Sequence, residues 1–168
     1  VWGWFGEENP FAFNLKFTAA AGIKRFLVGT PPVISLSAIE PGLDLLLEAG
    51  MQNLRKKSVL QSEYLIFLWN EFLKPLRFDL GSPNSSTRRG SHVSIRHPEA
   101  YRICKALIHP KDDSPKIIPD FREPDNIRLG IAPIYNTYQD IYYAVKRMEE
   151  IVSLKLYDSY SNEREAVT

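Results

Sequence analysis

Two long stretches in which apolar residues recur at helical spacing frame this chain, from Ser35 to about Leu73 and from Tyr138 to about Leu156. Between them lie shorter runs with strand-like alternation, separated by turn-forming residues. A chain that mixes long helical segments with several short strands is typical of an α+β fold. We therefore expect a small, mostly antiparallel sheet with helices packed on one face.

The expected strands follow from local alternation and from flanking turn residues. The clearest is 91–96, in which Val93 and Ile95 share one face. Further strands are expected at 25–28, at 77–80, beginning at 117–118, and at 127–131, and a further helix at 98–108.

Proline and glycine divide the first helical stretch. Pro41 and Gly42 fall in its first turn, where proline is tolerated. Gly50 is expected to interrupt or bend the helix, and Pro75 to end it.

The composition restricts the functions open to the chain. Its 168 residues suffice for one compact domain, or for one domain and a piece of another. The net charge of +1 gives no argument for nucleic acid or an anionic membrane, and no apolar run approaches the ~20 residues of a membrane-spanning helix. The single cysteine, Cys104, cannot form an internal disulfide and lies in an apolar periodic run, which predicts a core residue in a reducing, cytoplasmic setting.

Arg128 is the residue whose surroundings most suggest chemistry. It stands among Ile127, Leu129 and Ile131 in a strand-like run. A charged side chain is rarely found there unless an anion meets it or its tip reaches solvent, and arginine is well shaped to hold a carboxylate through two parallel hydrogen bonds. Pattern alone favours the simpler interpretation, an outward-facing arginine on a half-buried strand, over a carboxylate clamp.

Other polar groups give weaker signals. None of the three histidines has zinc-site spacing, so no metal site is predicted, and His97 before Pro98 fits the entry to a helix. Arg88 and Arg89 form a basic turn that we expect to be solvated. The sequence has no Gly-rich phosphate loop or dinucleotide fingerprint, and the turn at 29–32 is only a weak phosphate signal.

Several local strings, taken in order, carry a resemblance to one known family. They are 3–6 (GWFG), 11–13 (FAF), 22–32 (GIKRFLVGTPP), 42–45 (GLDL), 49–51 (AGM), 54–58 (LRKKS), 88–98 (RRGSHVSIRHP) and the stretch 120–140. Together they resemble kynureninase, from Gly3 to about Val152, beginning just downstream of the family's cofactor lysine.

The resemblance implies a pyridoxal-phosphate enzyme of the aspartate-aminotransferase fold (fold type I), a homodimer with its active site at the subunit interface. The implied reaction hydrolyses the Cβ–Cγ bond of L-kynurenine or 3-hydroxykynurenine, giving anthranilate or 3-hydroxyanthranilate and L-alanine in tryptophan degradation. Residues 1–35 would then end the large cofactor-binding domain and 36–74 form a connecting helical region. Residues 75–158 would form the small C-terminal domain, and 159–168 a polar tail.

Four residues take roles through the resemblance. Arg128 matches the arginine that binds the substrate α-carboxylate. Trp4 and Thr30 match residues that contact the cofactor phosphate from the neighbouring subunit, and an indole N–H and a hydroxyl are both competent donors. Phe5 adjoins the place of the substrate's aromatic ring. Glu7 departs from the pattern, because relatives commonly carry histidine there, and this would alter the charge of the pocket or the substrate preference.

The family's Schiff-base lysine, its ring-stacking aromatic residue and its aspartate at the pyridine nitrogen would all lie upstream of Val1. We therefore expect the chain to be part of a longer protein and to hold no catalytic residue of its own. Two other classes stay open: another fold type I enzyme, of the class V aminotransferase or cysteine-desulfurase type, and a non-catalytic interaction domain. A desulfurase needs a reactive cysteine on a mobile loop, and the predicted helical position of Cys104 argues against it.

Overall fold

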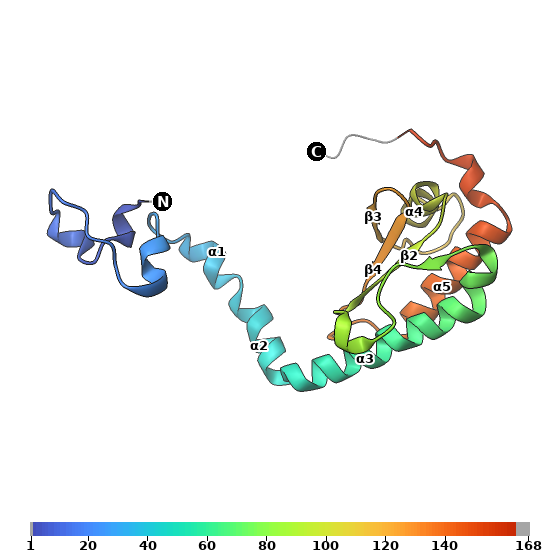
Figure 1. Ribbon diagram of the computed structural model, residues 1–168, viewed down its shortest axis with the longest axis horizontal. Coiled ribbons are helices and arrows are strands. Elements are labelled where there is room, and N and C mark those ends of the chain that lie inside the picture. Colours follow the sequence, from blue (N-terminus) through green and yellow to red (C-terminus); the bar gives the residue numbers. More distant parts are fainter. Residues whose placement is uncertain (1, 164–168) are drawn as a thin grey trace. The chain divides into compact units, whose positions relative to one another are not determined.

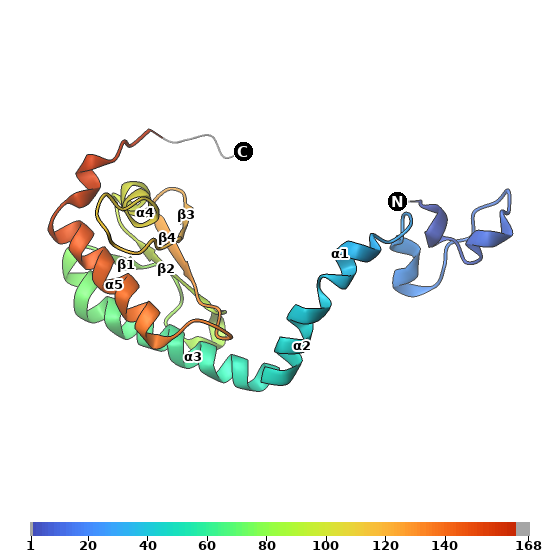
Figure 2. The same ribbon diagram turned by 180° about the vertical axis from the view of Figure 1, so that it is seen from behind.

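The computed structural model describes residues 2–163, so the expected polar tail lies partly outside the described residues. The chain forms two compact units, residues 1–48 and 49–168 (Figures 1 and 2). Each unit is described by itself.

The first unit consists of short turns followed by two helices. Its only buried residues among those described are Gly6 and Ala20, so it has almost no core of its own. The strand expected at 25–28 was wrong, because a 3₁₀ turn occupies Gly22–Phe26. The elements are the 3₁₀ turns Trp4–Gly6, Pro10–Ala12 and Gly22–Phe26, helix α1 (Val33–Ser37) and helix α2 (Glu40–Ala49).

Glycine separates α2 from the long helix of the second unit, as the sequence predicts. Gly50 has a φ of 75°, a conformation that residues with a Cβ rarely adopt, and helix α3 (Met51–Leu68) begins directly after it. Regular α-helical bonding ends at Leu68. A π-helical turn (Trp69–Leu73) and a 3₁₀ turn (Lys74–Leu76) follow, so the helical run ends at Leu76, one residue after Pro75.

The second unit is built on a four-stranded antiparallel sheet with strand order β1-β2-β4-β3. This confirms the expected α+β class and the antiparallel pairing. The strands are β1 (Asp79–Leu80), β2 (His92–Arg96), β3 (Asp120–Arg122) and β4 (Asn126–Gly130). The remaining elements are a 3₁₀ turn (Ser86–Arg88), helix α4 (Ala100–Ile108), helix α5 (Tyr138–Ser153) and a last 3₁₀ turn (Leu156–Ser159).

One face of this sheet carries the core. Val93 and Ile95 of β2 and Ile127 of β4 are fully buried, because alternate residues of a strand point to the same side. They join one hydrophobic cluster with Ile103 of α4 and Val145 of α5. Helices α3 and α4 contact the strands, and α5 packs against both helices (Figures 1 and 2). The opposite face of the sheet remains polar.

The strand expected to begin at 117–118 begins later, at Asp120. The Ile117 N–H donates to the carbonyl of Leu107, at the end of α4, at 3.0 Å and not to a neighbouring strand. Pro119 has no N–H for a ladder, and the strand β3 begins one residue later, at Asp120.

No helix in the described part of the chain is long and apolar enough to cross a membrane.

Candidate functional site

Arg128 lies at the middle of β4, and its side chain leaves the sheet on the polar face. Its neighbours Ile127 and Leu129 are buried on the opposite face. The Arg128 side chain is 39% exposed. The outward-facing interpretation of the sequence is confirmed, and this orientation leaves the guanidinium accessible to an anion.

The Arg128 guanidinium is anchored at one nitrogen. Its Nη2 forms an ion pair with Oδ2 of Asp120, which stands directly opposite on β3. The same carboxylate oxygen accepts a hydrogen bond from Nε of Arg122 at 3.0 Å. Within residues 2–163, Nε and Nη1 of Arg128 have no hydrogen-bond partner. A fork with open N–H groups can still hold a carboxylate in a bidentate manner.

Small and polar residues lie beside Arg128 on the same face. Ser94 of β2 stands opposite Arg128, and its hydroxyl donates to Oδ1 of Asn126 at 2.9 Å. The N–H of Gly81 donates to the carbonyl of Ser94 at 2.8 Å. A Cβ at position 81 would come within 3.1 Å of Asn126 Oδ1 and 3.2 Å of Ser94 Oγ. Only glycine therefore fits here without displacing this pair.

The loop that follows β4 is tied to α3. Lys57 Nζ donates to the carbonyl of Pro133 at 2.6 Å, and Gln61 Nε2 donates to that of Asn136 at 2.7 Å. Oδ1 of Asn136 in turn accepts from the N–H of Ala132 at 2.8 Å. These bonds hold the loop after β4 against α3, and they therefore restrain the end of the strand that carries Arg128.

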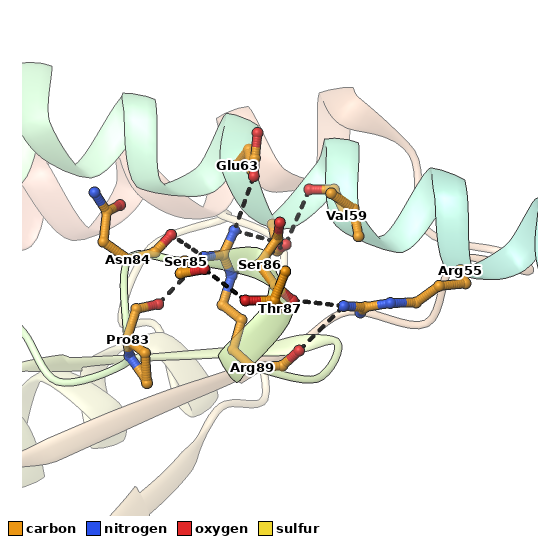
Figure 3. Close-up of polar contacts among 10 residues, drawn as sticks. Arg55, Val59, Glu63, Pro83, Asn84, Ser85, Ser86, Thr87 and Arg89 are labelled. Atoms are coloured by element: carbon orange, nitrogen blue, oxygen red, sulfur yellow. Dashed lines mark hydrogen bonds and ion pairs between the residues drawn. The ribbon is translucent and has the colours of Figure 1, made fainter.

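Arg89 is buried beside α3, and the expectation of a solvated turn was wrong for this residue. Its side chain is 2% exposed, and the guanidinium donates to Ser62 Oγ at 3.3 Å, to the Pro83 carbonyl at 3.2 Å and to the Asn84 carbonyl. Arg55 donates to two further carbonyls of the same loop, at 2.6 and 3.3 Å. Figure 3 shows both arginines reaching between α3 and the loop that joins β1 to β2. The two arginines therefore hold this loop, and with it the entry to β2, against α3.

Trp4 and Phe5 lie in the first unit, in an aromatic cluster with Phe11. The ring centroids of Trp4 and Phe5 are 4.2 Å apart, and that of Phe11 lies 5.7 Å from Trp4 and 6.1 Å from Phe5. Trp4 is 46% exposed, and its Nε1 donates to no atom in the described part of the chain. The cluster therefore offers an apolar surface with one indole donor at its edge.

Thr30 lies just after a close backbone contact with the segment that carries Trp4. A Cβ at Gly3 would come within 2.1 Å of the backbone of Val28, so the two backbones touch there. Trp4 follows Gly3, and Thr30 is exposed two residues after Val28. The Thr30 hydroxyl also has no hydrogen bond among the residues described. The segments that carry Trp4 and Thr30 therefore meet at Gly3 and Val28, and an indole N–H and a hydroxyl are each able to donate to a phosphate group.

The four residues assigned by resemblance are thus divided between the units. Trp4, Phe5 and Thr30 belong to the first unit, and Arg128 belongs to the second.

Cys104 is buried in α4, as the sequence predicts, and His97 stands at the entry to that helix, as expected, and is also buried. Nδ1 of His97 accepts from the N–H of Glu99 at 3.0 Å at the entry to α4, and burial lowers the pKa of this imidazole. Burial also raises the pKa of the Cys104 thiol to about 12, so the thiol remains protonated. Among residues 2–163, no three His, Cys, Asp or Glu side chains gather as metal ligands would.

A cavity of about 510 Å³ lies between residues 115–119 and the start of α5. Its lining is largely apolar and includes Ile117, Leu129 and Ile141. Arg128 does not line it, because Arg128 and Leu129 point to opposite faces of β4. The cavity and the polar face are separate features of the second unit.

Comparison with known proteins gives a consistent result. The family model described as the kynureninase C-terminal domain matches residues 54–148. The kynureninase of Geobacillus thermodenitrificans (strain NG80-2) is 36% identical over 167 residues, which are 98% of this chain and 38% of that relative. The kynureninases of Bacillus mycoides (strain KBAB4) and Pseudomonas fluorescens are 35% and 37% identical, over 98% and 91% of this chain and 38% and 36% of their own lengths.

The chain spans less than two fifths of the length of these curated relatives and aligns with them along nearly all of its own. The matched domain model covers more than half of the chain and contains the whole of β4 with Arg128. On this evidence, the chain belongs to the kynureninase family.

Proposed function

We propose that this chain is the C-terminal part of a pyridoxal-phosphate-dependent kynureninase. The complete protein would hydrolyse the Cβ–Cγ bond of L-kynurenine or 3-hydroxykynurenine, releasing anthranilate or 3-hydroxyanthranilate and L-alanine. Such a hydrolase acts in tryptophan degradation and supplies precursors for NAD biosynthesis. Family membership supports the reaction class, and the single structural observation that carries the proposal is the open guanidinium of Arg128.

Arg128 binds the α-carboxylate of the substrate in this proposal. Three features support the role: the side chain lies on the polar face of the sheet, Nη2 is already anchored by Asp120, and Nε and Nη1 have no partner among the residues described. A charge-assisted, bidentate bond to a carboxylate is both strong and directional. Arg128 therefore orients the amino-acid end of the substrate and leaves the reacting carbon atoms free.

The first unit contributes to cofactor binding. Trp4 Nε1 and Thr30 Oγ1 donate to the phosphate of pyridoxal phosphate in a neighbouring copy of the protein, which makes the functional form a homodimer. Phe5 lies beside the aromatic ring of the substrate. When bound, the cofactor supplies the electron sink that carbanion chemistry requires. No lysine of this chain takes the Schiff-base role, which belongs to a segment outside it.

The proposed domain boundaries separate the residues that bind the cofactor from Arg128, which binds the substrate. Residues 1–35 complete the large cofactor-binding domain, 36–74 connect the domains, and 75–158 form the small domain that carries Arg128. A cytoplasmic location agrees with the single, buried thiol of Cys104.

Another fold type I activity is the competing candidate. A cysteine desulfurase needs an accessible, ionisable thiol, whereas Cys104 is buried in α4 and its pKa is raised to about 12. An aminotransferase also binds a carboxylate through an arginine, so only the reaction product separates it from a kynureninase.

The deciding experiment uses the complete polypeptide that contains this chain, purified with pyridoxal phosphate. We expect anthranilate fluorescence to appear from L-kynurenine, together with an equal amount of L-alanine. A transaminated product without anthranilate, or no turnover of either kynurenine form, would contradict the proposal.

The cofactor role of Trp4 has a matched control in the same unit. Trp4→Phe keeps an aromatic ring but removes the Nε1 donor, so we expect weaker binding of pyridoxal phosphate by roughly fivefold to tenfold. Trp2→Phe removes the same group from an exposed indole that contacts Phe17, and is expected to leave cofactor affinity unchanged. Equal affinities of both variants and the parent protein would remove Trp4 from the cofactor site.

A further inference from the structure

We infer that Asp120, supported by Arg122, is a positioning residue that prepares Arg128 to receive the substrate carboxylate. The inference rests on the proposed function, because it presumes that Arg128 binds that carboxylate.

The pairing of β3 with β4 places the Asp120 side chain beside that of Arg128. Asp120 and Arg128 are directly paired across the two strands, and Arg122 is paired with Asn126 two residues further along. Residues two apart on a strand share a face, so all of these side chains lie on the polar side of the sheet. Oδ2 of Asp120 meets Arg122 Nε at 3.0 Å and forms the ion pair with Arg128 Nη2. One carboxylate oxygen thus links two guanidinium groups.

The charges of this cluster do not cancel. Arg122 and Arg128 carry two positive charges against the single negative charge of Asp120, which leaves one positive charge in excess. A neighbouring ion pair, between Arg96 of β2 and Asp125 in the turn between β3 and β4, has its atoms 3.3 Å apart and is balanced within itself. Because Arg122 shares the carboxylate, Asp120 restrains Arg128 without neutralising its attraction for an anion.

Restraint matters because these side chains are partly exposed. Arg128 is 39% and Asp120 43% exposed, so a guanidinium without an anchor would sample several rotamers and would lose that freedom when the substrate binds. Holding Nη2 in advance lowers this entropic cost. It also leaves the second hydrogen of Nη2, with Nε and Nη1, available to the incoming carboxylate.

The test is steady-state kinetics of the complete holoenzyme with L-kynurenine. Asp120→Asn is expected to raise KM by about tenfold and to change kcat by less than about twofold, because a carboxylate contact is made equally in the ground state and the transition state. Asp125→Asn removes the same charge from the turn between β3 and β4, at a carboxylate that pairs with Arg96 and not with Arg128, and is expected to leave both constants unchanged. Equal KM values for the two variants would overturn the inference.

A second readout separates positioning from a general structural effect. The inhibition constant of the amine analogue of kynurenine that lacks the α-carboxylate should be unchanged by Asp120→Asn, since Arg128 has nothing to hold in that ligand. In an Arg128→Ala background, Asp120→Asn should have no further effect on KM. A further rise in KM there, or weaker binding of the amine, would show that Asp120 acts on the fold and not through Arg128.

The same set of variants separates a failure of the proposed role of Arg128 from a failure of the positioning role of Asp120. If Arg128→Ala itself leaves KM unchanged, the proposed function of Arg128 is wrong. If Arg128→Ala raises KM while Asp120→Asn does not, Arg128 keeps its role and only the positioning by Asp120 is wrong.

Discussion

The buried guanidinium of Arg89 donates two hydrogen bonds to the hydroxyl oxygen of Ser62, from Nε at 3.4 Å and from Nη2 at 3.3 Å. Ser62 belongs to α3, and Arg89 lies in the loop that joins β1 to β2. This contact joins the helix to the loop that leads into β2, the strand that pairs with β4. The loop therefore takes part in placing the sheet that carries Arg128.

Replacing Arg89 by leucine should destabilise the second unit by on the order of 3 kcal/mol, because two loop carbonyls and the Ser62 hydroxyl lose their donor in a buried place. Urea unfolding of the complete protein, followed by circular dichroism, measures the change. Arg88→Leu is the matched control, since Arg88 is exposed. Similar midpoints for the two variants would contradict the role given to Arg89.

The buried imidazole of His97 predicts a pH-dependent stability. Burial lowers the pKa of His97 in the folded protein below its ordinary value of 6.5. The unfolded chain therefore takes up a proton first, so this contribution is complete above about pH 6.5 and is lost as the pH falls from there toward the folded pKa.

His97→Asn tests this prediction, because the amide oxygen can still accept from the Glu99 N–H but does not titrate. The free energy of unfolding of this variant should fall less steeply between about pH 7 and pH 5 than that of the parent protein. His109→Asn replaces an exposed histidine and is the control for the substitution itself. An unchanged slope in the His97 variant would show that another group titrates in this range.

Gly81→Ala should destabilise the protein by about 1 kcal/mol or more, because its Cβ would press on the Ser94–Asn126 pair at 3.1 to 3.2 Å. Gly90→Ala provides the comparison, since no atom lies within 4 Å of a Cβ there and the substitution should be neutral or slightly stabilising. Thermal unfolding of both variants checks the difference, and a Gly81 variant as stable as the Gly90 variant would show that the polar face can adjust.

The isolated 168-residue chain should hold no lysine-linked pyridoxal phosphate after free cofactor is removed, because no lysine of this chain is assigned the Schiff-base role. The complete protein, treated in the same way, should show the visible absorbance of the bound cofactor. A stoichiometric band in the isolated chain would mean that the cofactor site is contained within these residues.

Much of the second unit could be predicted from sequence, because its local patterns agree with its burial. The alternation of β2 and β4 and the apolar stripe of α5 correspond directly to the buried residues Val93, Ile127 and Val145. Helix α5 also begins at a capping box between Thr137 and Asp140, which stabilises its first turn.

The strand expected at 25–28 and the strand start expected at 117–118 were misplaced for the same physical reason. Both were short runs of mainly apolar residues, and such a run becomes a strand only where a neighbouring strand shares its backbone hydrogen bonds. Ile117 instead bonds to the end of α4, and Leu27 bonds back to Lys24 in a 3₁₀ turn. Such partners are set by tertiary structure and leave no periodic signal in the sequence.

The candidate site was predicted only in part, because some of its contacts are also set by tertiary structure. Arg128 was recognisable because a charge in an apolar run is unusual, and its strand-like context indicated the exposed face. The contribution of Asp120 depends on a cross-strand register, and the burial of Arg89 depends on α3, which is far away in the sequence. A signal did exist for Asp120, since Asp120 and Arg122 alternate on a short segment just before the Arg128 strand.

The most direct test of the account is the KM for L-kynurenine of the complete holoenzyme carrying Arg128→Ala, measured beside Arg96→Ala. Arg96 is an arginine of the same sheet face that pairs with Asp125, so its removal controls for the loss of a surface charge. We predict that Arg128→Ala lowers kcat/KM by about 100-fold, mainly through KM, whereas Arg96→Ala changes it by less than about twofold. Equal and small effects of the two substitutions would contradict the assignment of Arg128 as the carboxylate clamp.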